Sequence, residues 1–375
     1  MNIVSERKYY DSRIKKIFTR RNNHKTSNLI ILKDENIYYL SGFYGKDSGS
    51  ILLIVDDDIH LLVNFIYLEQ ARKSVKNNNL NITCYKKNKF RELSKILENY
   101  SFRSVGVEGK NINFAGFRKL EKLLSGQGKR LVSIDGVVEN LRTVKDEVEI
   151  SKIKNACKIT DKVFGSIINS GAAAINKLSE IELACKLEEL LVKSNSDGRS
   201  FDTIVAYGKN SSMPHYSPQK IKVKDGLILM DFGCRFENYC SDMTRTIFIK
   251  NQKICNEFKK IYDIVLKAQL LAIENCREGV TCSQLDRIAR KFITSKGYGN
   301  NFGHRLGHGV GIEVHEEPAV TMENREVLKE NMIITIEPGI YIENFGGIRI
   351  EDMVIVGKND CEVLYNSKKS FFILD

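Results

Sequence analysis

The N-terminal third of the chain alternates between two patterns of apolar and polar positions. Short apolar runs predict β-strands at 28–33, 49–57, 59–65 and 132–135. Apolar residues at helical spacing predict amphipathic helices at 66–75, 90–100 and 114–124. Alternation of strands and helices is typical of an α/β domain, so we predict such a domain over residues 1–135.

Residues 136–375 follow a different pattern. Amphipathic helices are predicted at 144–167, 179–194, about 254–276 and 282–296. Ser179 precedes the second of these helices, and Glu182 follows three positions later, which is the capping-box pattern. Two segments rich in Gly, His, Asp and Glu lie at 201–242 and 302–352. These two segments carry the candidate chemistry.

In the first segment, acidic residues stand at the ends of apolar runs. Asp231 closes the run Leu-Ile-Leu-Met-Asp, and Asp242 lies near the start of a strand-like run that extends to Ile249. Two acids at strand ends can face one cavity, where a buried carboxylate needs a cation or hydrogen bonds to offset its desolvation. A turn or cap role is the alternative explanation for either acid.

The second segment combines histidines with glycines. His304, His308 and His315 fall within twelve positions, and glycines surround them. Glycine lets the backbone bend and approach a ligand closely. A single histidine is more often structural than a ligand, whereas this grouping favours a binding site.

Two further acids follow in the same segment. Glu337 comes after an apolar run and before Pro-Gly, where a strand is expected to end. Arg349 and Glu351 are two positions apart, so on one strand both side chains would point to the same face. A salt bridge between Arg349 and Glu351 is the alternative to a ligand role for this acid.

Four carboxylates and one imidazole therefore form a candidate metal centre, made of Asp231, Asp242, His308, Glu337 and Glu351. Oxygen ligands with a single nitrogen suit Mn²⁺, Co²⁺, Zn²⁺ or Fe²⁺. Two divalent ions would neutralise the four negative charges. Two metals about 3.5–4 Å apart can activate a water and hold a carbonyl oxygen, as in aminopeptidases. We predict two divalent metal ions, with Mn²⁺ preferred.

These motifs resemble the signature blocks of the pita-bread metallopeptidases, which include methionine aminopeptidase, aminopeptidase P, prolidase and creatinase. The matching blocks are DFG…YCSDMTRT, GHGVGIEVHEEP, TIEPGIYI and GIRIED, in the family's order over about the last 240 residues. The N-terminal region resembles the creatinase-type domain. The resemblance implies an α+β fold, with a creatinase-like α/β domain at 1–135 and a pita-bread domain with a curved antiparallel sheet at 136–375.

The resemblance also implies a role for each candidate ligand. Asp231 would chelate the first metal, and Asp242 and Glu351 would bridge both metals. His308 and Glu337 would bind the second metal. Glu337 would also accept the proton of the attacking water.

Four more residues match positions around the family's substrate. His215 and His315 match the two histidines that contact the substrate and the reaction intermediate. His304 matches a histidine on the wall of the substrate pocket, and Arg349 matches a supporting arginine. These residues are expected to act beside the metals rather than as ligands.

The resemblance implies hydrolysis of the bond between an N-terminal residue and a following proline, as in aminopeptidase P, by a homodimer. The alternative is an Xaa-Pro dipeptidase (prolidase), whose closed pocket would need a positive group to meet the free carboxylate of a dipeptide. Arg305 is a candidate for that group, with a surface salt bridge as its other explanation, and an arginine or lysine from the N-domain of a dimer mate is a second candidate. More distant alternatives are a non-proline amidohydrolase and a catalytically silent binding protein, and the complete ligand set argues against the silent protein.

Composition narrows the class of partner and the compartment. The net charge of +11 could reflect nucleic acid or membrane binding, but the sequence has no zinc finger, RNP-like aromatic pattern or sustained basic helix. We therefore predict a peptide substrate with proline at its second position, and neither a nucleic-acid nor a membrane partner. The nine cysteines form no CxxC pair, and no secretory signal pattern is evident, so a cytoplasmic location is expected.

Overall fold

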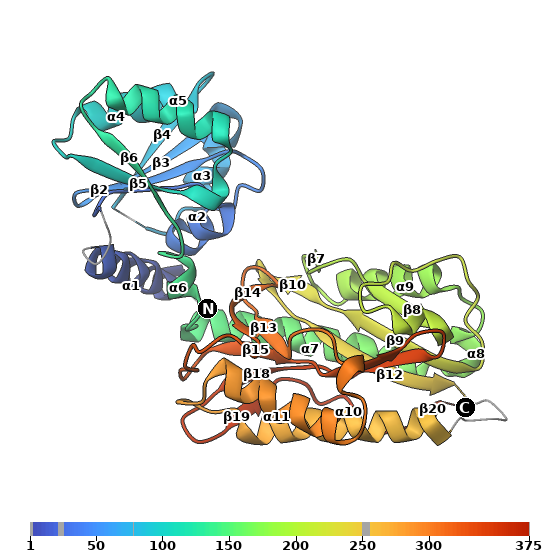
Figure 1. Ribbon diagram of the computed structural model, residues 1–375. Helices are drawn as coiled ribbons and strands as arrows, with labels where there is room; N and C mark the ends of the chain where they lie inside the picture. Colours follow the sequence, from blue (N-terminus) through green and yellow to red (C-terminus); the bar gives the residue numbers. More distant parts are fainter. Residues whose placement is uncertain (1–2, 22–25, 78, 250–255, 375) are drawn as a thin grey trace. The chain divides into compact units, whose positions relative to one another are not determined.

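The computed structural model describes residues 3–21, 26–77, 79–249 and 256–374. The chain forms two compact units that divide between Arg142 and Thr143 (Figure 1). The domain boundary predicted after residue 135 stays a prediction. Among the described residues, no helix combines the length and the apolar character needed to cross a membrane.

The first unit is built on a mixed sheet in the order β4-β3-β2-β1-β5-β6. Its strands are β1 (Leu29–Ile31), β2 (Ile51–Val55), β3 (Asp58–Asn64), β4 (Leu80–Tyr85), β5 (Ser104–Glu108) and β6 (Arg130–Ile134). Strand β2 runs antiparallel to both of its neighbours, and the other pairs are parallel. The helices are α1 (Ile3–Arg21), α2 (Asp34–Ser41), α3 (Leu68–Ser74), α4 (Lys89–Glu98), α5 (Phe114–Ser125) and α6 (Glu139–Arg142), with short 3₁₀ turns at Phe65–Tyr67 and Gly109–Asn111. The predicted α/β architecture is confirmed.

Helix α1 is the largest element that the sequence patterns did not predict. It buries Tyr10, Arg13, Ile14 and Ile17 on one face. The Arg13 guanidinium lies over the Tyr10 ring, 4.9 Å from its centroid. Because a charged residue occupies the middle of the buried stripe, the apolar periodicity of this segment is weak.

The second unit contains two large sheets and two small ones. The large sheets have the orders β20-β12-β9-β8 and β14-β13-β15-β18-β19, and the small ones β11-β10-β7 and β16-β17. The strands are β7 (Gly198–Arg199), β8 (Ile204–Tyr207), β9 (Gly226–Phe232), β10 (Cys234–Phe236), β11 (Tyr239–Cys240), β12 (Met243–Ile249), β13 (Gly307–Gly309), β14 (Glu316–Val320), β15 (Ile333–Ile336), β16 (Gly339–Ile342), β17 (Gly346–Arg349), β18 (Asp352–Val356), β19 (Cys361–Val363) and β20 (Ile373–Leu374). Apart from the parallel pair β12 and β20, these strands pair antiparallel, as predicted.

Helices cover the sheets of the second unit (Figure 1). They are α7 (Glu147–Asn169), α8 (Ala172–Ile175), α9 (Glu180–Lys193), α10 (Asn256–Asn275) and α11 (Cys282–Ser295), with 3₁₀ turns at Gly208–Ser212 and Gly299–Asn301. The capping box at the start of α9 is confirmed, because Ser179 and Glu182 each accept the other's backbone N–H. The four predicted helices are all present, and residues 254 and 255 of the third prediction lie outside the described residues.

Two predicted strands are interrupted at their acidic residues. The run around Asp242 breaks after β11 and resumes as β12, and the run around Glu351 breaks after β17 and resumes as β18. At both breaks the chain leaves one sheet and enters another. The prediction of one continuous strand through Arg349 and Glu351 was therefore wrong. The breaks leave both acids between ladders, where their side chains can turn toward a shared centre.

Candidate metal centre and active-site cleft

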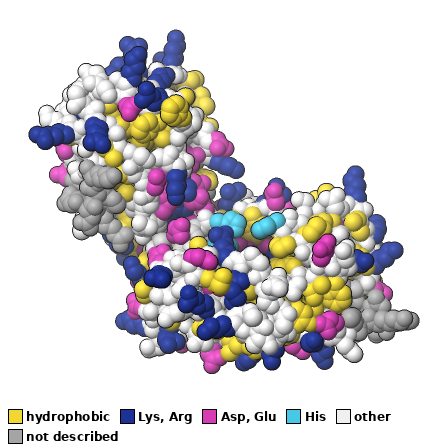
Figure 2. Space-filling model, in the orientation of Figure 1, with side chains coloured by type: hydrophobic (Ala, Val, Ile, Leu, Met, Phe, Trp, Pro, Cys, Tyr) yellow, Lys and Arg dark blue, Asp and Glu magenta, His cyan; other side chains and the backbone are white. Residues whose placement is uncertain are grey.

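The second unit contains a cleft of about 670 Å³. All nine residues that the sequence predicts for the site line it, namely Asp231, Asp242, His308, Glu337, Glu351, His215, His304, His315 and Arg349. Arg305 lines the same cleft. Histidine side chains are visible at the surface near basic and acidic side chains in Figure 2. The structure therefore brings together residues that are separated by up to about 140 positions in the sequence.

Three of the predicted ligands form a compact group at the floor of the cleft. Asp242, His308 and Glu351 each offer one ligand atom, and these atoms all lie within 4.8 Å of one another. Asp242 precedes β12, His308 lies in β13 and Glu351 precedes β18, so three different strands position them. All three are buried.

His308 presents one ring nitrogen to the acids. Its Nδ1 donates to the backbone carbonyl of Gly309 over 3.0 Å, which turns Nε2 toward the acidic group. Nε2 lies 3.3 Å from Glu337 Oε1 and 3.6 Å from Asp242 Oδ2. A histidine held by a backbone carbonyl through its other nitrogen is the usual arrangement of a metal ligand.

Asp231 lies at the end of β9 and meets Arg349 rather than a second acid. Arg349 donates from Nη2 to Asp231 Oδ2 over 2.5 Å. The other carboxylate oxygen of Asp231, Oδ1, is buried without a hydrogen-bond partner among the described residues. The predicted alternative of a salt bridge between Arg349 and Glu351 is thus replaced by a pair between Arg349 and Asp231.

Burial and mutual repulsion shift the pKa values of the acids in this centre. Burial raises the pKa of Asp242 and of Glu351 well above the ordinary range, and the neighbouring carboxylates raise both further. Burial also raises the pKa of Asp231, against the opposing effect of Arg349. Burial acts to raise the pKa of Glu337 as well, but His308, His304 and Arg349 outweigh it and lower that pKa to about 2. These carboxylates thus repel one another in a buried centre, where a bound cation would offset the repulsion.

The donor set fits a pair of divalent cations. It offers four carboxylates and one imidazole, and Arg349 offsets only one of the four negative charges. The unpartnered Oδ1 of Asp231 is a buried acceptor of the kind that a cation satisfies. Oxygen donors with a single nitrogen match the preferences of the first-row divalent metals that the sequence suggested.

Hydroxyl groups around the acids form contacts that the sequence analysis did not identify. Thr244 donates to Glu351 Oε2 over 2.6 Å and accepts from Arg349 Nε over 3.0 Å. Thr335 donates to Glu337 Oε1 over 3.1 Å and accepts from the His308 backbone N–H over 3.0 Å. Thr335 precedes Glu337 by two positions, so a search for hydroxyls on the same strand face would have found it.

A chain of hydrogen bonds links Arg349 to His304. Arg349 Nη1 donates to the Tyr341 hydroxyl over 2.7 Å, and Tyr341 Oη lies 3.1 Å from His304 Nε2. His304 Nδ1 donates to the Arg305 carbonyl over 2.7 Å, so Nε2 can accept from Tyr341. His304 is therefore held in one orientation on the wall of the cleft.

His215 and His315 are the exposed histidines of the cleft. The His315 ring lies 4.4 Å from the His308 ring, centroid to centroid. Partial burial, with smaller effects from His308 and Arg305, lowers the pKa of His315 to about 4. Its imidazole is thus neutral at pH 7 and can donate a hydrogen bond to a substrate next to the metal centre.

We expect a His315→Ala variant to keep its metal content while its kcat falls by about 10²–10³, the usual effect of losing one donor to a developing oxyanion. Elemental analysis and steady-state kinetics measure the two quantities. His60→Ala is the matched control, because His60 lies in the first unit and should leave both unchanged. Loss of metal from His315→Ala would show that the ligand histidine has been assigned wrongly.

Comparison with known proteins identifies the family. A model of metallopeptidase family M24 matches residues 151–358, and a model of the creatinase/prolidase N-terminal domain matches residues 13–144. The chain belongs to metallopeptidase family M24, with the pita-bread catalytic domain of that family preceded by a creatinase-type domain. It is accordingly a metallo-exopeptidase of the group that includes Xaa-Pro dipeptidases.

Relatives match along nearly the whole chain. An Xaa-Pro dipeptidase from Pyrococcus horikoshii is 36% identical, over 98% of this chain and 99% of the relative. The structure of an Xaa-Pro dipeptidase from Bacillus anthracis superposes with a TM-score of 0.90 at 31% identity, over 97% of this chain and 100% of that one. An X-Pro aminopeptidase from Thermotoga maritima superposes with a TM-score of 0.82 at 35% identity, over 92% of this chain and 97% of that one.

Proposed function

We propose that the protein is a two-metal Xaa-Pro dipeptidase that cleaves the bond between the two residues of its substrate. The observation that carries the proposal is the single cleft lined by all nine predicted residues, with Asp242, His308 and Glu351 grouped at its floor. Mn²⁺ as the metal, the homodimer and the cytoplasmic location are further parts of the proposal.

The chain's own residues divide the work around the metal centre. Bound divalent ions would supply Lewis acidity, which activates a water and polarises a carbonyl group. Glu337, whose carboxylate is ionised at neutral pH, accepts the proton of that water and passes it to the leaving amine. His215 and His315 line the open part of the cleft, where a hydrogen bond to the carbonyl oxygen strengthens as negative charge develops on it.

The dipeptidase activity is preferred over the aminopeptidase P activity because of the relatives' names and one feature of the cleft. The sequence motifs favour cleavage of longer peptides, whereas relatives named Xaa-Pro dipeptidases match the chain over nearly its full length. Of the two arginines that line the cleft, Arg349 pairs with Asp231, and Arg305 is exposed and forms no ion pair with the described residues. Arg305 is therefore the cationic group that could meet the free carboxylate of a dipeptide.

We expect kcat/KM for Ala-Pro to exceed that for Ala-Pro-Ala by at least tenfold. Arg305→Ala should lower kcat/KM for Ala-Pro by about tenfold and leave kcat/KM for Ala-Pro-Ala nearly unchanged. A charged hydrogen bond contributes about 1.5–3 kcal/mol, and exposure to solvent weakens it, so the expected loss lies at the lower end of that range. Arg325→Ala is the matched control, since Arg325 is exposed and lies outside the cleft.

The same measurement tests the second candidate function, an aminopeptidase P activity on longer peptides. The Thermotoga maritima relative named X-Pro aminopeptidase supports that candidate. Equal or better cleavage of Ala-Pro-Ala would assign the protein to the aminopeptidase class. Cleavage of neither peptide by metal-loaded protein would overturn both candidates.

A further inference from the structure

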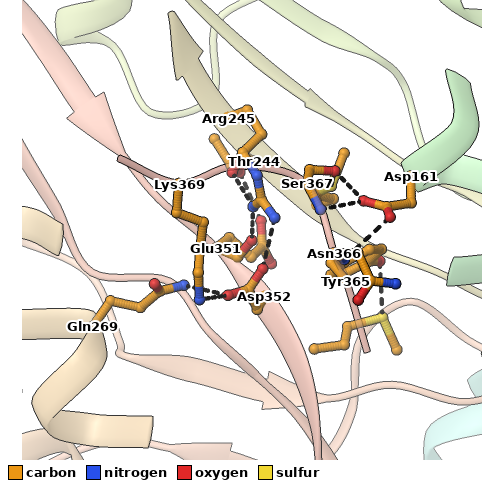
Figure 3. A network of polar contacts seen from close by, with 12 residues as sticks. Asp161, Thr244, Arg245, Gln269, Glu351, Asp352, Tyr365, Asn366, Ser367 and Lys369 are labelled. Carbon is orange, nitrogen blue, oxygen red and sulfur yellow. Dashed lines mark hydrogen bonds and ion pairs between the residues drawn. The ribbon is translucent and has the colours of Figure 1, made fainter. Parts of the chain in front are cut away.

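A short C-terminal segment, Leu364 to Lys369, contacts Asp242 and the neighbour of Glu351, Asp352. Figure 3 labels four residues of this segment: Tyr365, Asn366, Ser367 and Lys369. The segment begins where the backbone N–H of Leu364 donates to the Met353 carbonyl over 3.0 Å. The match to the family model ends at residue 358, so the segment lies beyond the family's matched region. Its contacts with the centre are therefore a feature of this chain that the matched signature does not describe.

Tyr365 contacts both the N–H and the carbonyl group of the Asp242 backbone. The Tyr365 hydroxyl donates to the Asp242 carbonyl over 2.7 Å and accepts from the Asp242 N–H over 3.2 Å. Asp242 lies in the gap between β11 and β12, outside either ladder, and buried backbone groups there need other partners. One hydroxyl can meet both needs because it donates and accepts at the same time.

Glu351 is linked to the same segment through a series of ion pairs and hydrogen bonds. Arg245 donates from Nη1 to the Glu351 carbonyl over 2.5 Å and from Nη2 to Asp352 Oδ1 over 2.8 Å. The second oxygen of Asp352 accepts from Lys369 and, over 3.1 Å, from Gln269. Asp352 is fully buried, so its position depends on these partners.

The segment itself is tied to two helices. Asp161 of α7 accepts from the backbone N–H groups of Asn366 over 3.1 Å and Ser367 over 2.9 Å, and also from the Ser367 hydroxyl. Tyr262 of α10 donates to the Lys369 carbonyl over 2.8 Å. The segment is thus anchored at two points after Tyr365, in addition to the Leu364 bond that precedes it.

We propose that residues 364–369 act as a positioning element for the metal centre, with Tyr365 as the positioning residue that fixes Asp242. The inference rests on the proposed function, in which Asp242 and Glu351 are ligands of the metal centre. A ligand whose backbone lies outside a ladder needs such support to hold its carboxylate in place. Partners that orient metal ligands typically contribute 10–100-fold to metal affinity.

The test is calorimetric titration of Mn²⁺ into metal-stripped Tyr365→Phe, which removes the hydroxyl and keeps the ring. We expect the Kd for Mn²⁺ to rise by about 10–100-fold relative to the wild type. Tyr207→Phe is the matched control, because the Tyr207 hydroxyl also donates to a backbone carbonyl, that of Asp225, but lies outside the cleft. Its Kd should equal that of the wild type.

A second variant keeps the test decisive if Tyr365→Phe does not fold. Asp161→Ala removes the anchor of Asn366 and Ser367 without touching a residue of the cleft. We expect a smaller rise in the Kd for Mn²⁺, of several-fold. The visible absorption spectrum of the Co²⁺-loaded variants should also shift, since it reports ligand geometry, whereas a loss of global stability alone would leave the spectrum of the folded protein unchanged.

The outcomes separate this inference from the proposed function. If the wild type binds two Mn²⁺ ions and the folded Tyr365→Phe and Asp161→Ala variants bind them with unchanged Kd and Co²⁺ spectrum, the positioning role is overturned and the function stands. If the wild type itself binds no Mn²⁺, the proposed metal centre is wrong and the inference falls with it.

Discussion

A Glu337→Gln variant is expected to lose about 10²–10⁴-fold in kcat, with a much smaller change in KM. Glu337 is the acid that the cleft keeps ionised, because His308, His304 and Arg349 lower its pKa to about 2 against the effect of burial. Thr335 and His308 hold its Oε1, at 3.1 and 3.3 Å. A glutamine keeps the shape of the side chain but cannot accept the proton of the attacking water.

Steady-state kinetics on an Xaa-Pro dipeptide, with metal content measured on the same samples, check this prediction. Glu343→Gln is the matched control, since Glu343 is exposed and lies outside the cleft. A Glu337→Gln enzyme within threefold of the wild type would remove the proton-transfer role. If the variant has lost its metal, the lost activity reflects the role of Glu337 as a metal ligand instead.

An Asp242→Ala variant is expected to lose bound metal and all measurable peptidase activity while remaining folded. Asp242 belongs to the compact group with His308 and Glu351, so its loss removes a ligand that both metals are proposed to share. Elemental analysis and the peptidase assay measure the two losses. Asp263→Ala, an exposed position on α10, is the control that should keep both.

The fold should survive this change because the metal-free centre is electrostatically unfavourable. Burial and the neighbouring acids raise the pKa of Asp242, so the folded protein binds a proton there more tightly than the unfolded chain does. The stabilising contribution of such a group is present below its unfolded pKa and is lost as pH rises through its folded pKa. At pH 7 the metal-free Asp242→Ala protein should therefore melt no lower than the metal-free wild type. Full metal content and activity in the variant would contradict the ligand assignment.

Asp231 and Glu337 could be predicted because each closes an apolar run or follows one. Asp231 and Glu337 end buried strands, and this local pattern is visible without any knowledge of distant contacts. The breaks at Asp242 and Glu351 were not visible in the same way. The residues around them are apolar enough to continue a strand, and only the change from one sheet to another interrupts it.

The supporting contacts could not be predicted, because they join positions that are far apart in sequence. Tyr365 lies 123 residues from Asp242, and Thr244 lies 107 residues from Glu351. The local sequence around a buried tyrosine or threonine does not predict which residue its hydroxyl contacts. The pairing of Arg349 with Asp231 was missed for the same reason, since Glu351 is its neighbour along the chain.

The proposed two-metal peptidase activity is tested most directly by the rate of Ala-Pro hydrolysis by metal-stripped protein as Mn²⁺ is added back. We expect no hydrolysis without metal, and a rate that reaches its maximum when about two ions per chain are bound. Ala-Ala in place of Ala-Pro should be cleaved far more slowly. Undiminished hydrolysis in the presence of a chelator, or no hydrolysis of Ala-Pro at any metal concentration, would contradict the central claim.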